Sequence, residues 1–382
     1  MILYLKYKYC ENVAEVGDAE CLKYAHEEGY PWSKYVCEKA AKNGHLNCLI
    51  YAHENGCPWD NWTCKFAAEN GHFECLEYAH NNGCPWDELT CAFAAKKGDL
   101  KCLEYAHTHG CPWNNWTCEY AAENGNLNCL RYAYNRGCCW DKTVCANAAK
   151  YGHFDCLVYA RENGCPWNQN TCAYAALHGH LKCLKYAHEN GCPWDENTCV
   201  YAVKNRHLIC LRYAYEHGCP WSKYVCEIAA ENGDLECLIY AHEHECEWDE
   251  KTCAYAAKNG HLTCLKYAHE NGCRWDDYVC AFAVQNHNWD CLAYATSKKA
   301  SWRRVRPRDV ERILKRWHSL RVILRWILKI KKRKMKKMVH LISDAWIQYS
   351  YAPVIGRPGY ERGRNSFLNS IYEKNQALSP DE

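Results

Sequence analysis

The chain has 382 residues, of which 48% are hydrophobic and 24% charged, and this composition excludes a disordered chain. No run of about 18 apolar residues predicts a membrane span, and the first residues lack the order of a secretory signal. We therefore expect a cytoplasmic protein whose 32 cysteines are free thiols. The net charge of +2 divides into −11 over residues 1–300 and +13 over 301–382.

In chain order, residues 1–9 begin in the middle of a repeat. The repeating pattern then continues to about residue 302. Tryptophans and three sets of cysteines recur every 27 residues, and Cys139 alone of the cysteines falls outside these sets. A fixed period of this length is typical of repeat proteins, in which stacked neighbours bury each other's apolar faces. The tryptophans in register are Trp32, Trp59, Trp86, Trp113, Trp140, Trp167, Trp194, Trp221, Trp248, Trp275 and Trp302.

Each repeat predicts two helices of about nine to ten residues. The first starts after the N-cap residue Asp60 and ends at Gly71, with the Cys-x-x-Ala-Ala motif of 64–68 on its buried face. The second starts after another N-cap position, His72, and ends at Gly83, because glycine tolerates the left-handed backbone that closes many helices. The second N-cap position also holds Asp99, Asn126 and Asp234.

The segment GCPWD at 56–60 joins consecutive repeats and returns at 83–87 and 191–195. Its glycine ends a helix, its proline fixes a turn and its aspartate caps the next helix. We expect the tryptophan to be a structural wedge that buries on the order of 150–250 Å² between repeats. One repeat cannot bury such surfaces alone, so the repeats should stack into a solenoid.

The segment 258–273, KNGHLTCLKYAHENGC, resembles the ankyrin-repeat pattern G-H-L-x-V-V-x-L-L-L-x-x-G-A. Thr252-Cys253-Ala254-Tyr255-Ala256-Ala257 resembles the T-P-L-H-L-A-A opening of that repeat, one residue shorter. The resemblance covers about residues 10–302, and it is similar to the short cysteine- and tryptophan-rich ankyrin arrays of giant DNA viruses and some protists. The period is 27 residues rather than the family's roughly 33, so the β-hairpin finger is missing.

The resemblance implies an all-α, ankyrin-like solenoid of helix–turn–helix repeats without β-hairpin fingers. About ten full repeats, with partial units at the ends, should occupy residues 1–302. The family's role implies a monomeric, non-enzymatic scaffold that binds a protein partner, such as a host or regulatory protein, through its helix face. If the protein is viral, its location would be the host cytoplasm.

The recurring cysteines leave packing, zinc binding and a disulfide ladder open. Structural zinc takes four ligands, commonly paired as C-x2–4-C, and no such close pair recurs. The histidine at His53 is replaced by Tyr134, Arg161 and Tyr215 in other repeats, which is not the behaviour of a ligand. We therefore favour packing, since free cysteine behaves as a small buried hydrophobe. We expect no metal, no cofactor and no small-molecule substrate.

No residue pattern predicts catalysis. A nucleophilic cysteine needs a unique position beside a base, whereas 31 of these cysteines repeat and Cys139 occupies a proline position in GCCWD. No glycine-rich phosphate loop, HExxH helix or Ser/His/Asp order is present. We therefore predict that the protein is not an enzyme.

Two rows of large side chains form the candidate partner-binding surface, because binding surfaces favour exposed aromatic residues. The first row is the third residue after each tryptophan, and the second lies on the first helix of each repeat. The alternative is packing, over neighbouring tryptophans for the first row and between repeats for the second. The candidates are Tyr35, Trp62, Leu89 and Trp116 of the first row, and Phe66, Phe93 and Tyr120 of the second.

The C-terminal region predicts a basic amphipathic helix at 303–350, which would cap the last repeat, and a loosely ordered tail at 351–382. The segment 303–337 has a net charge of +14. The second hypothesis is therefore binding of nucleic acid or anionic membrane by this segment, with the repeats as a spacer. The same run could be a nuclear import signal, which makes the nucleus an alternative location. The run consists of Lys331, Lys332, Arg333, Lys334, Lys336 and Lys337.

Overall fold

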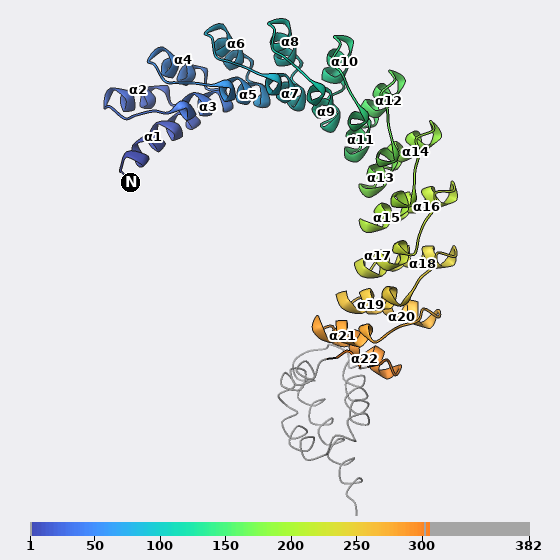
Figure 1. The fold of residues 1–382 in the computed structure, drawn as a ribbon. Coiled ribbons are helices and arrows are strands. Elements are labelled where there is room, and N and C mark those ends of the chain that lie inside the picture. The colour runs from blue at the N-terminus through green and yellow to red at the C-terminus, as the bar shows by residue number, and fades with distance from the viewer. Residues whose placement is uncertain (1, 302, 306–382) are drawn as a thin grey trace, which may run out of the picture. The chain divides into compact units, whose positions relative to one another are not determined.

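The computed structural model describes residues 2–301 and 303–305, which form 22 α-helices and no β-strand (Figure 1). They belong to two compact units, residues 1–248 and 249–382. None of the 22 helices combines the length and apolarity that crossing a membrane requires. Except for 303–305, the predicted capping helix (303–350), its basic run and the tail (351–382) lie outside the described residues.

The helices of the first unit are α1 (Ile2–Val16), α2 (Ala19–Glu27), α3 (Lys34–Lys42), α4 (Leu46–Glu54), α5 (Asn61–Asn70), α6 (Phe73–Asn81), α7 (Glu88–Lys97), α8 (Leu100–Thr108), α9 (Asn115–Glu123), α10 (Leu127–Asn135), α11 (Lys142–Tyr151), α12 (Phe154–Glu162), α13 (Gln169–Leu177), α14 (Leu181–Glu189), α15 (Glu196–Lys204), α16 (Leu208–Glu216), α17 (Tyr224–Asn232) and α18 (Leu235–Glu243). Those of the second unit are α19 (Glu250–Asn259), α20 (Leu262–Glu270), α21 (Tyr278–Gln285) and α22 (Trp289–Ser297).

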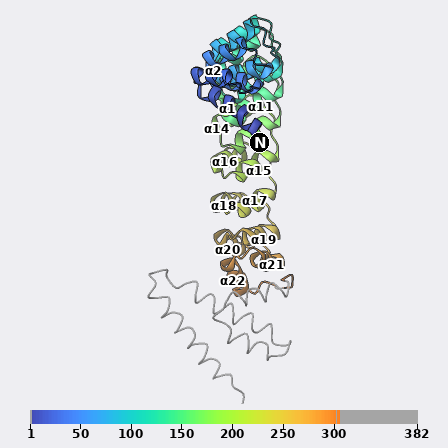
Figure 2. The same ribbon diagram turned by 90° about the vertical axis from the view of Figure 1, so that its left-hand side faces the viewer.

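The helices of the first unit form two layers. Odd-numbered helices lie side by side on the inner side of a curved row, and even-numbered helices lie on its outer side (Figure 1). Figure 2 shows α15 and α17 in one layer and α16 and α18 in the other. Neighbouring odd helices contact one another more extensively than neighbouring even helices do. Within the described residues, the predicted all-α solenoid of helix–turn–helix repeats is confirmed.

The ends of the first helix follow the sequence prediction. Asp60 has extended backbone (φ −142°, ψ −174°), and its side chain accepts a hydrogen bond from the Trp62 N–H at 3.0 Å. Helix α5 ends at Gly71, whose φ of 77° lies in the left-handed region. Gly83 follows α6 with a φ of 80°. These two glycines adopt at no steric cost a backbone that other residues avoid, so each helix stops after nine or ten residues.

The predicted N-cap position of the second helix is confirmed, but of the residues found there only aspartate accepts a capping hydrogen bond through its side chain. Asp99 accepts a hydrogen bond from the Cys102 N–H at 3.0 Å, whereas His72 and Asn126 make no such bond. The Asn126 amide instead donates to the Ala95 carbonyl of the preceding repeat at 2.8 Å.

Histidine at this position also reaches back to the repeat before it. The His153 Nε2 atom lies 3.0 Å from the Glu123 carbonyl oxygen. Its ring covers Gly125, where a Cβ atom would lie 2.5 Å from His153 Nδ1. Glycine is therefore required here both for its positive φ and for the space it leaves. The position links two repeats where the sequence predicted a local cap.

The core lies between the layers and consists mainly of cysteine, leucine and alanine. The predicted core positions of the second full repeat are at most 1% exposed: Cys64, Ala67, Ala68, Cys75, Leu76 and Ala79. Each second helix from α2 to α20 also buries one leucine completely: Leu22, Leu49, Leu76, Leu103, Leu130, Leu157, Leu184, Leu211, Leu238 and Leu265. Small side chains between the layers let short helices pack closely.

Trp59 stands in an aromatic ladder between consecutive repeats, as the predicted wedge requires. The Trp59 ring stacks on His53, with centroids 3.8 Å apart and planes 11° from parallel. Tyr78 of the next repeat lies edge-on to Trp59, at 6.4 Å and 69°. The His53 Nδ1 atom and the Tyr78 hydroxyl are 3.1 Å apart. Trp59 stays half-buried, and its contacts join two repeats.

This stacking explains why the histidine six residues before the tryptophan is interchangeable. Tyr134 stacks on Trp140 at a centroid distance of 3.8 Å. The Arg161 guanidinium carbon lies 4.2 Å from the centre of the Trp167 ring. Histidine, tyrosine and arginine all present a flat surface that can stack on indole. The variation at this position therefore follows a packing requirement.

The cysteines are free thiols, all buried except Cys21 and Cys139. The Cys84 thiol donates to the Asp60 carbonyl at 3.2 Å and so ties the end of a repeat to its first helix. Cys64 lies against this linker, with its sulfur 4.0 Å from the Cys84 carbonyl oxygen. The contact with Cys84 and burial raise the pKa of Cys64. These cysteines therefore occupy the small buried sites predicted for them, and the linker thiol adds a hydrogen bond.

Replacing Trp113 with alanine should lower the free energy of unfolding by about 2 kcal/mol. The change removes an indole that stacks on His107 at 3.8 Å and meets Tyr132 edge-on at 6.3 Å. Urea unfolding followed by circular dichroism measures the loss. Trp113→Phe keeps a stacking ring, so it should lose less than half as much. Equal losses for the two variants would contradict a stacking role.

The array should lose stability as the pH falls from about 7.5 to about 5.5. Burial, with a smaller contribution from Arg136, lowers the pKa of His107, and burial likewise lowers the pKa of His188. The unfolded chain, with histidine pKa values near roughly 6.5, then binds more protons than the folded chain. The stabilisation is therefore fully present above about pH 6.5 and is lost as the pH falls from there through the lower pKa values of the folded protein.

The His107→Tyr variant tests the origin of this pH dependence, since tyrosine occupies the same position at Tyr134 and Tyr215. Urea midpoints of the two proteins at pH 7.5 and 5.5 give the comparison. The variant should lose less stability than the native protein over this interval. An unchanged pH dependence would assign it to other groups.

A chromogenic disulfide reagent at pH 8 should react rapidly with two thiols of the native protein, Cys21 and Cys139. Of these, Cys21 should react more slowly, because its contact with Asp18 raises its pKa. Buried thiols should react only on unfolding, since burial raises the pKa of Cys156 to about 12. If fewer than 32 thiols per chain react in denaturant, some cysteines form disulfides or bind metal.

Candidate protein-binding surface

The two predicted rows lie together on the first helices of consecutive repeats. Trp62 and Phe66 stand four residues apart on α5, which places them on one face, with ring centroids 5.3 Å apart. Trp116 and Tyr120 occupy the same two places on α9. Because α3, α5, α7 and α9 are neighbours in the inner layer, the rows form a single surface. We call Tyr35, Trp62, Leu89, Trp116, Phe66, Phe93 and Tyr120 the aromatic face.

The members of the aromatic face differ in exposure. Tyr35, Trp62 and Trp116 are 50%, 39% and 40% exposed. Leu89 is half-buried, as are the three residues of the second row. Phe93 on α7 also stacks on Tyr120 of α9 at a centroid distance of 6.2 Å. The second row therefore contributes to packing between repeats, whereas the first row presents large apolar surface to solvent.

Beyond α9 the first row loses its apolar character. Thr143, Asn170 and Asn197 occupy the next three repeats. Tyr224 on α17 is exposed and has Asn197 as its counterpart in the preceding repeat. The continuous part of the surface is therefore carried by α3, α5, α7 and α9.

Lysines line the aromatic face, a feature that sequence reasoning missed. The Lys65 ammonium lies 4.6 Å from the centre of the Trp62 ring and 2.7 Å from Asp87 Oδ2. The Lys96 ammonium lies 5.5 Å from the centre of the Phe93 ring. Cations at this distance are attracted to the faces of aromatic rings. The three-residue spacing within a helix was the available signal, since it places Lys65 and Lys96 beside Trp62 and Phe93.

Each N-cap carboxylate beside this face serves two repeats. The Oδ1 atom of Asp87 accepts from the Leu89 N–H at 3.0 Å and so caps its own helix. The Oδ2 atom of Asp87 accepts from Lys65 and from the Asn61 amide, both in the preceding repeat. Charge and hydrogen-bonding capacity are therefore matched at this junction.

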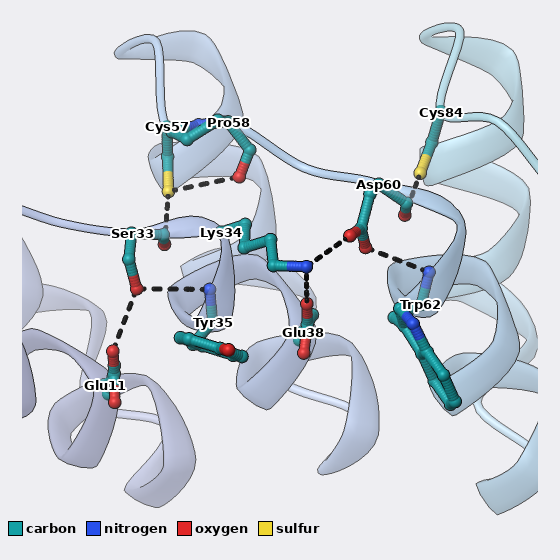
Figure 3. A network of polar contacts seen from close by, with 10 residues as sticks. All are labelled: Glu11, Ser33, Lys34, Tyr35, Glu38, Cys57, Pro58, Asp60, Trp62 and Cys84. Atoms are coloured by element: carbon teal, nitrogen blue, oxygen red, sulfur yellow. Dashed lines mark hydrogen bonds and ion pairs between the residues drawn. The ribbon is translucent and has the colours of Figure 1, made fainter.

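The corresponding junction between α3 and α5 contains two carboxylates (Figure 3). The Lys34 ammonium lies 2.7 Å from Asp60 Oδ2 and 3.7 Å from Glu38 Oε1. Burial, and to a smaller extent the charge of Asp60, raise the pKa of Glu38. Beside them, the Ser33 hydroxyl donates to Glu11 Oε1 at 2.8 Å. This network lies at the foot of the exposed ring of Tyr35.

Over residues 2–301 and 303–305, no three side chains of histidine, cysteine, aspartate or glutamate form a group that could hold a metal ion. The basic candidates of the tail lie outside these residues: Lys331, Lys332, Arg333, Lys334, Lys336 and Lys337.

Comparisons with known proteins find similarity among solved structures only. No protein-family model matches the sequence, and no curated protein matches it significantly. Among solved structures, the chain is similar to the human ASB11 ankyrin repeat domain, with 16% sequence identity and a TM-score of 0.37. The match covers 41% of this chain and 84% of that chain.

The repeat itself has the features that the sequence resemblance implied. Two helices such as α5 and α6 are joined by a tight turn at a left-handed glycine, Gly71. The next helix pair follows after a short linker, with no strand among the described residues where a β-hairpin finger would stand. The chain is therefore a helical repeat protein built from pairs of short helices.

Proposed function

We propose that the protein is a non-enzymatic scaffold that binds a protein partner through the aromatic face. The observation that carries the proposal is the row of large residues on neighbouring helices, of which Tyr35, Trp62 and Trp116 are exposed. Contiguous exposed apolar surface marks interaction sites on soluble proteins. Tryptophan and tyrosine are also the residues that most often supply the binding energy of an interface.

The arrangement of these residues supports a rigid binding surface. Their helices are held by caps such as Asp60 and by links between repeats such as Lys65–Asp87. A preformed surface loses little conformational entropy when a partner binds. Polar and charged side chains around Trp62 and Trp116 give the surface the mixed rim that protein interfaces have.

The rival proposal is that the basic segment 303–337 binds nucleic acid or anionic membrane, with the repeats as a spacer. The net charge of +14 over this segment favours it. Against it stands the net charge of −11 over residues 1–300, which would repel phosphates near the array. The two proposals differ in salt dependence, because phosphate contacts weaken steeply with salt and apolar contacts do not.

The Trp62→Ala/Trp116→Ala double variant tests the proposal once a partner has been identified by cross-linking to the full chain. Removing both rings should weaken binding by at least about 30-fold, since hot-spot residues contribute about 2 kcal/mol or more each. Titration calorimetry at 150 mM salt measures the dissociation constants. Tyr224→Ala, which removes an equally exposed ring outside the aromatic face, should leave binding unchanged.

A second variant separates the rival. Replacing Lys331, Lys332, Arg333, Lys334, Lys336 and Lys337 with glutamine should leave partner binding intact while removing any affinity for DNA, RNA or anionic vesicles. If this variant no longer binds the partner and the double tryptophan variant still does, the array is a spacer and the basic segment is the binding site.

A further inference from the structure

Glu38 on α3 is a carboxylate with an unsatisfied oxygen. The residue is 7% exposed, and its Oε1 atom accepts no hydrogen bond from the described part of the chain. The nearest cation is the Lys34 ammonium at 3.7 Å, and that ammonium lies closer to Asp60. Buried carboxylates in folded proteins normally have their hydrogen-bonding capacity met. Glu38 Oε1 therefore lacks a hydrogen-bond donor among the described residues.

The equivalent junction in the next repeat shows what is missing. Lys65 stands there at the position of Glu38, one period of 27 residues later, and pairs with Asp87 at 2.7 Å. That junction has one carboxylate and one ammonium. Between α3 and α5 the charge at this position is reversed, so Glu38 and Asp60 share the single ammonium of Lys34. Among the described groups, this junction is one cation short.

Another repeat shows that a glutamate at this position can be satisfied. Glu119 on α9 occupies it two repeats after Lys65, three residues after the exposed Trp116. Its Oε1 atom accepts from the Asn115 amide at 2.8 Å and from the Thr143 hydroxyl at 2.6 Å. The chain can therefore satisfy a glutamate at this position with its own side chains.

The surroundings of Glu38 suit a flat cation. Tyr35, three residues earlier on α3, is exposed, and Trp62 of the neighbouring α5 is exposed beside the same junction (Figure 3). Aromatic faces attract cations and stack on guanidinium groups. The Lys34 side chain that covers the two carboxylates is 42% exposed. A long, flexible lysine of this kind can move aside at little cost.

We propose that Glu38 and Asp60 receive the guanidinium of an arginine presented by the protein partner, with Tyr35 and Trp62 flanking it. This inference rests on the proposed function and names the chemistry of the partner's anchor residue. A guanidinium has five N–H donors in one plane, so it can bond to both carboxylates together. It would give Glu38 the donor that Lys65 gives Asp87 in the next repeat.

Two pools of blocked nine-residue peptides test the proposal with the full-length protein. Both are random mixtures of apolar and aromatic residues, with arginine at the centre of one and citrulline, its neutral isostere, at the centre of the other. Fluorescence anisotropy at 150 mM salt measures affinity. The arginine pool should bind at least tenfold more tightly than the citrulline pool, because truncating one partner of a desolvated charge pair typically costs at least that factor.

Three variants determine where the arginine binds. Glu38→Gln should reduce the preference for arginine to less than about twofold. Glu38→Lys should abolish it, since it introduces the residue that the next repeat carries and fills the site from within. Glu119→Gln removes the same charge from a carboxylate that is already satisfied, so it should leave the preference unchanged.

Stability distinguishes binding from a structural role. Glu38→Gln and Glu38→Lys should unfold at urea concentrations equal to or higher than the native protein does, because they remove a buried unsatisfied carboxylate. Glu119→Gln should unfold at a lower concentration, because it weakens a link between repeats. A lower midpoint for both Glu38 variants would make Glu38 structural and overturn the proposal.

Two binding results would also overturn it. One is a native protein that binds the arginine and citrulline pools equally; the other is an equal loss of arginine preference in Glu38→Gln and Glu119→Gln. Failure here is distinct from failure of the proposed function. If the Glu38→Gln variant still binds the identified partner and the Trp62→Ala/Trp116→Ala variant does not, partner binding by the aromatic face is supported. The arginine site at Glu38 is then wrong.

Discussion

A helix pair of 27 residues cannot bury its own apolar surface, and the rest of the structure follows from that constraint. Each group of side chains that sets the fold reaches into the adjacent repeat. Trp59 and His53 complete their contacts with Tyr78, and Asn126 bonds to the Ala95 carbonyl of the repeat before it. The repeats are therefore stable only as neighbours, and a change in one repeat is transmitted first to the adjacent one.

The same constraint limits where the chain can vary. The residues of the second helix and the linker form the leucine core, the aromatic ladder and the hydrogen bonds donated by the linker thiols. The exposed side of the first helix makes none of these contacts, so its residues change from repeat to repeat. The first-row position there is Tyr35, Trp62, Leu89, Trp116 and Thr143 in five successive repeats. Recognition is therefore expected on the inner layer of helices.

The sequence predicted contacts within one repeat more successfully than contacts between repeats. The cap at Asp60, the helix end at Gly71 and the burial of Cys64 depend on a few adjacent residues, and the periodic pattern was sufficient for them. The role of His153 was missed, because it depends on the distance to a carbonyl 30 residues earlier. The stacking partners of Trp59 were missed for a similar reason, since Tyr78 belongs to the next repeat.

The candidate surface shows the same limit. Both rows of the aromatic face followed from the period, yet the sequence left packing as an alternative for each. The ion pair of Lys65 with Asp87 was beyond prediction, because it joins residues of different repeats through side chains that point along the array. A repeating sequence fixes which residues are equivalent, but the geometry of stacking decides which of them meet.

Equivalence between repeats then makes an anomaly informative. Glu119 shows that the chain can satisfy a glutamate at the position of Glu38 with an amide and a hydroxyl, and Lys65 shows that it can place a cation there instead. Either solution was available to the first repeat, where Glu38 keeps an unsatisfied oxygen beside a second carboxylate. Such a cost opposes folding, and functional sites are where proteins retain interactions that oppose folding. The energetic defect and the exposed rings of Tyr35 and Trp62 coincide at one junction, as expected if a partner supplies the missing charge.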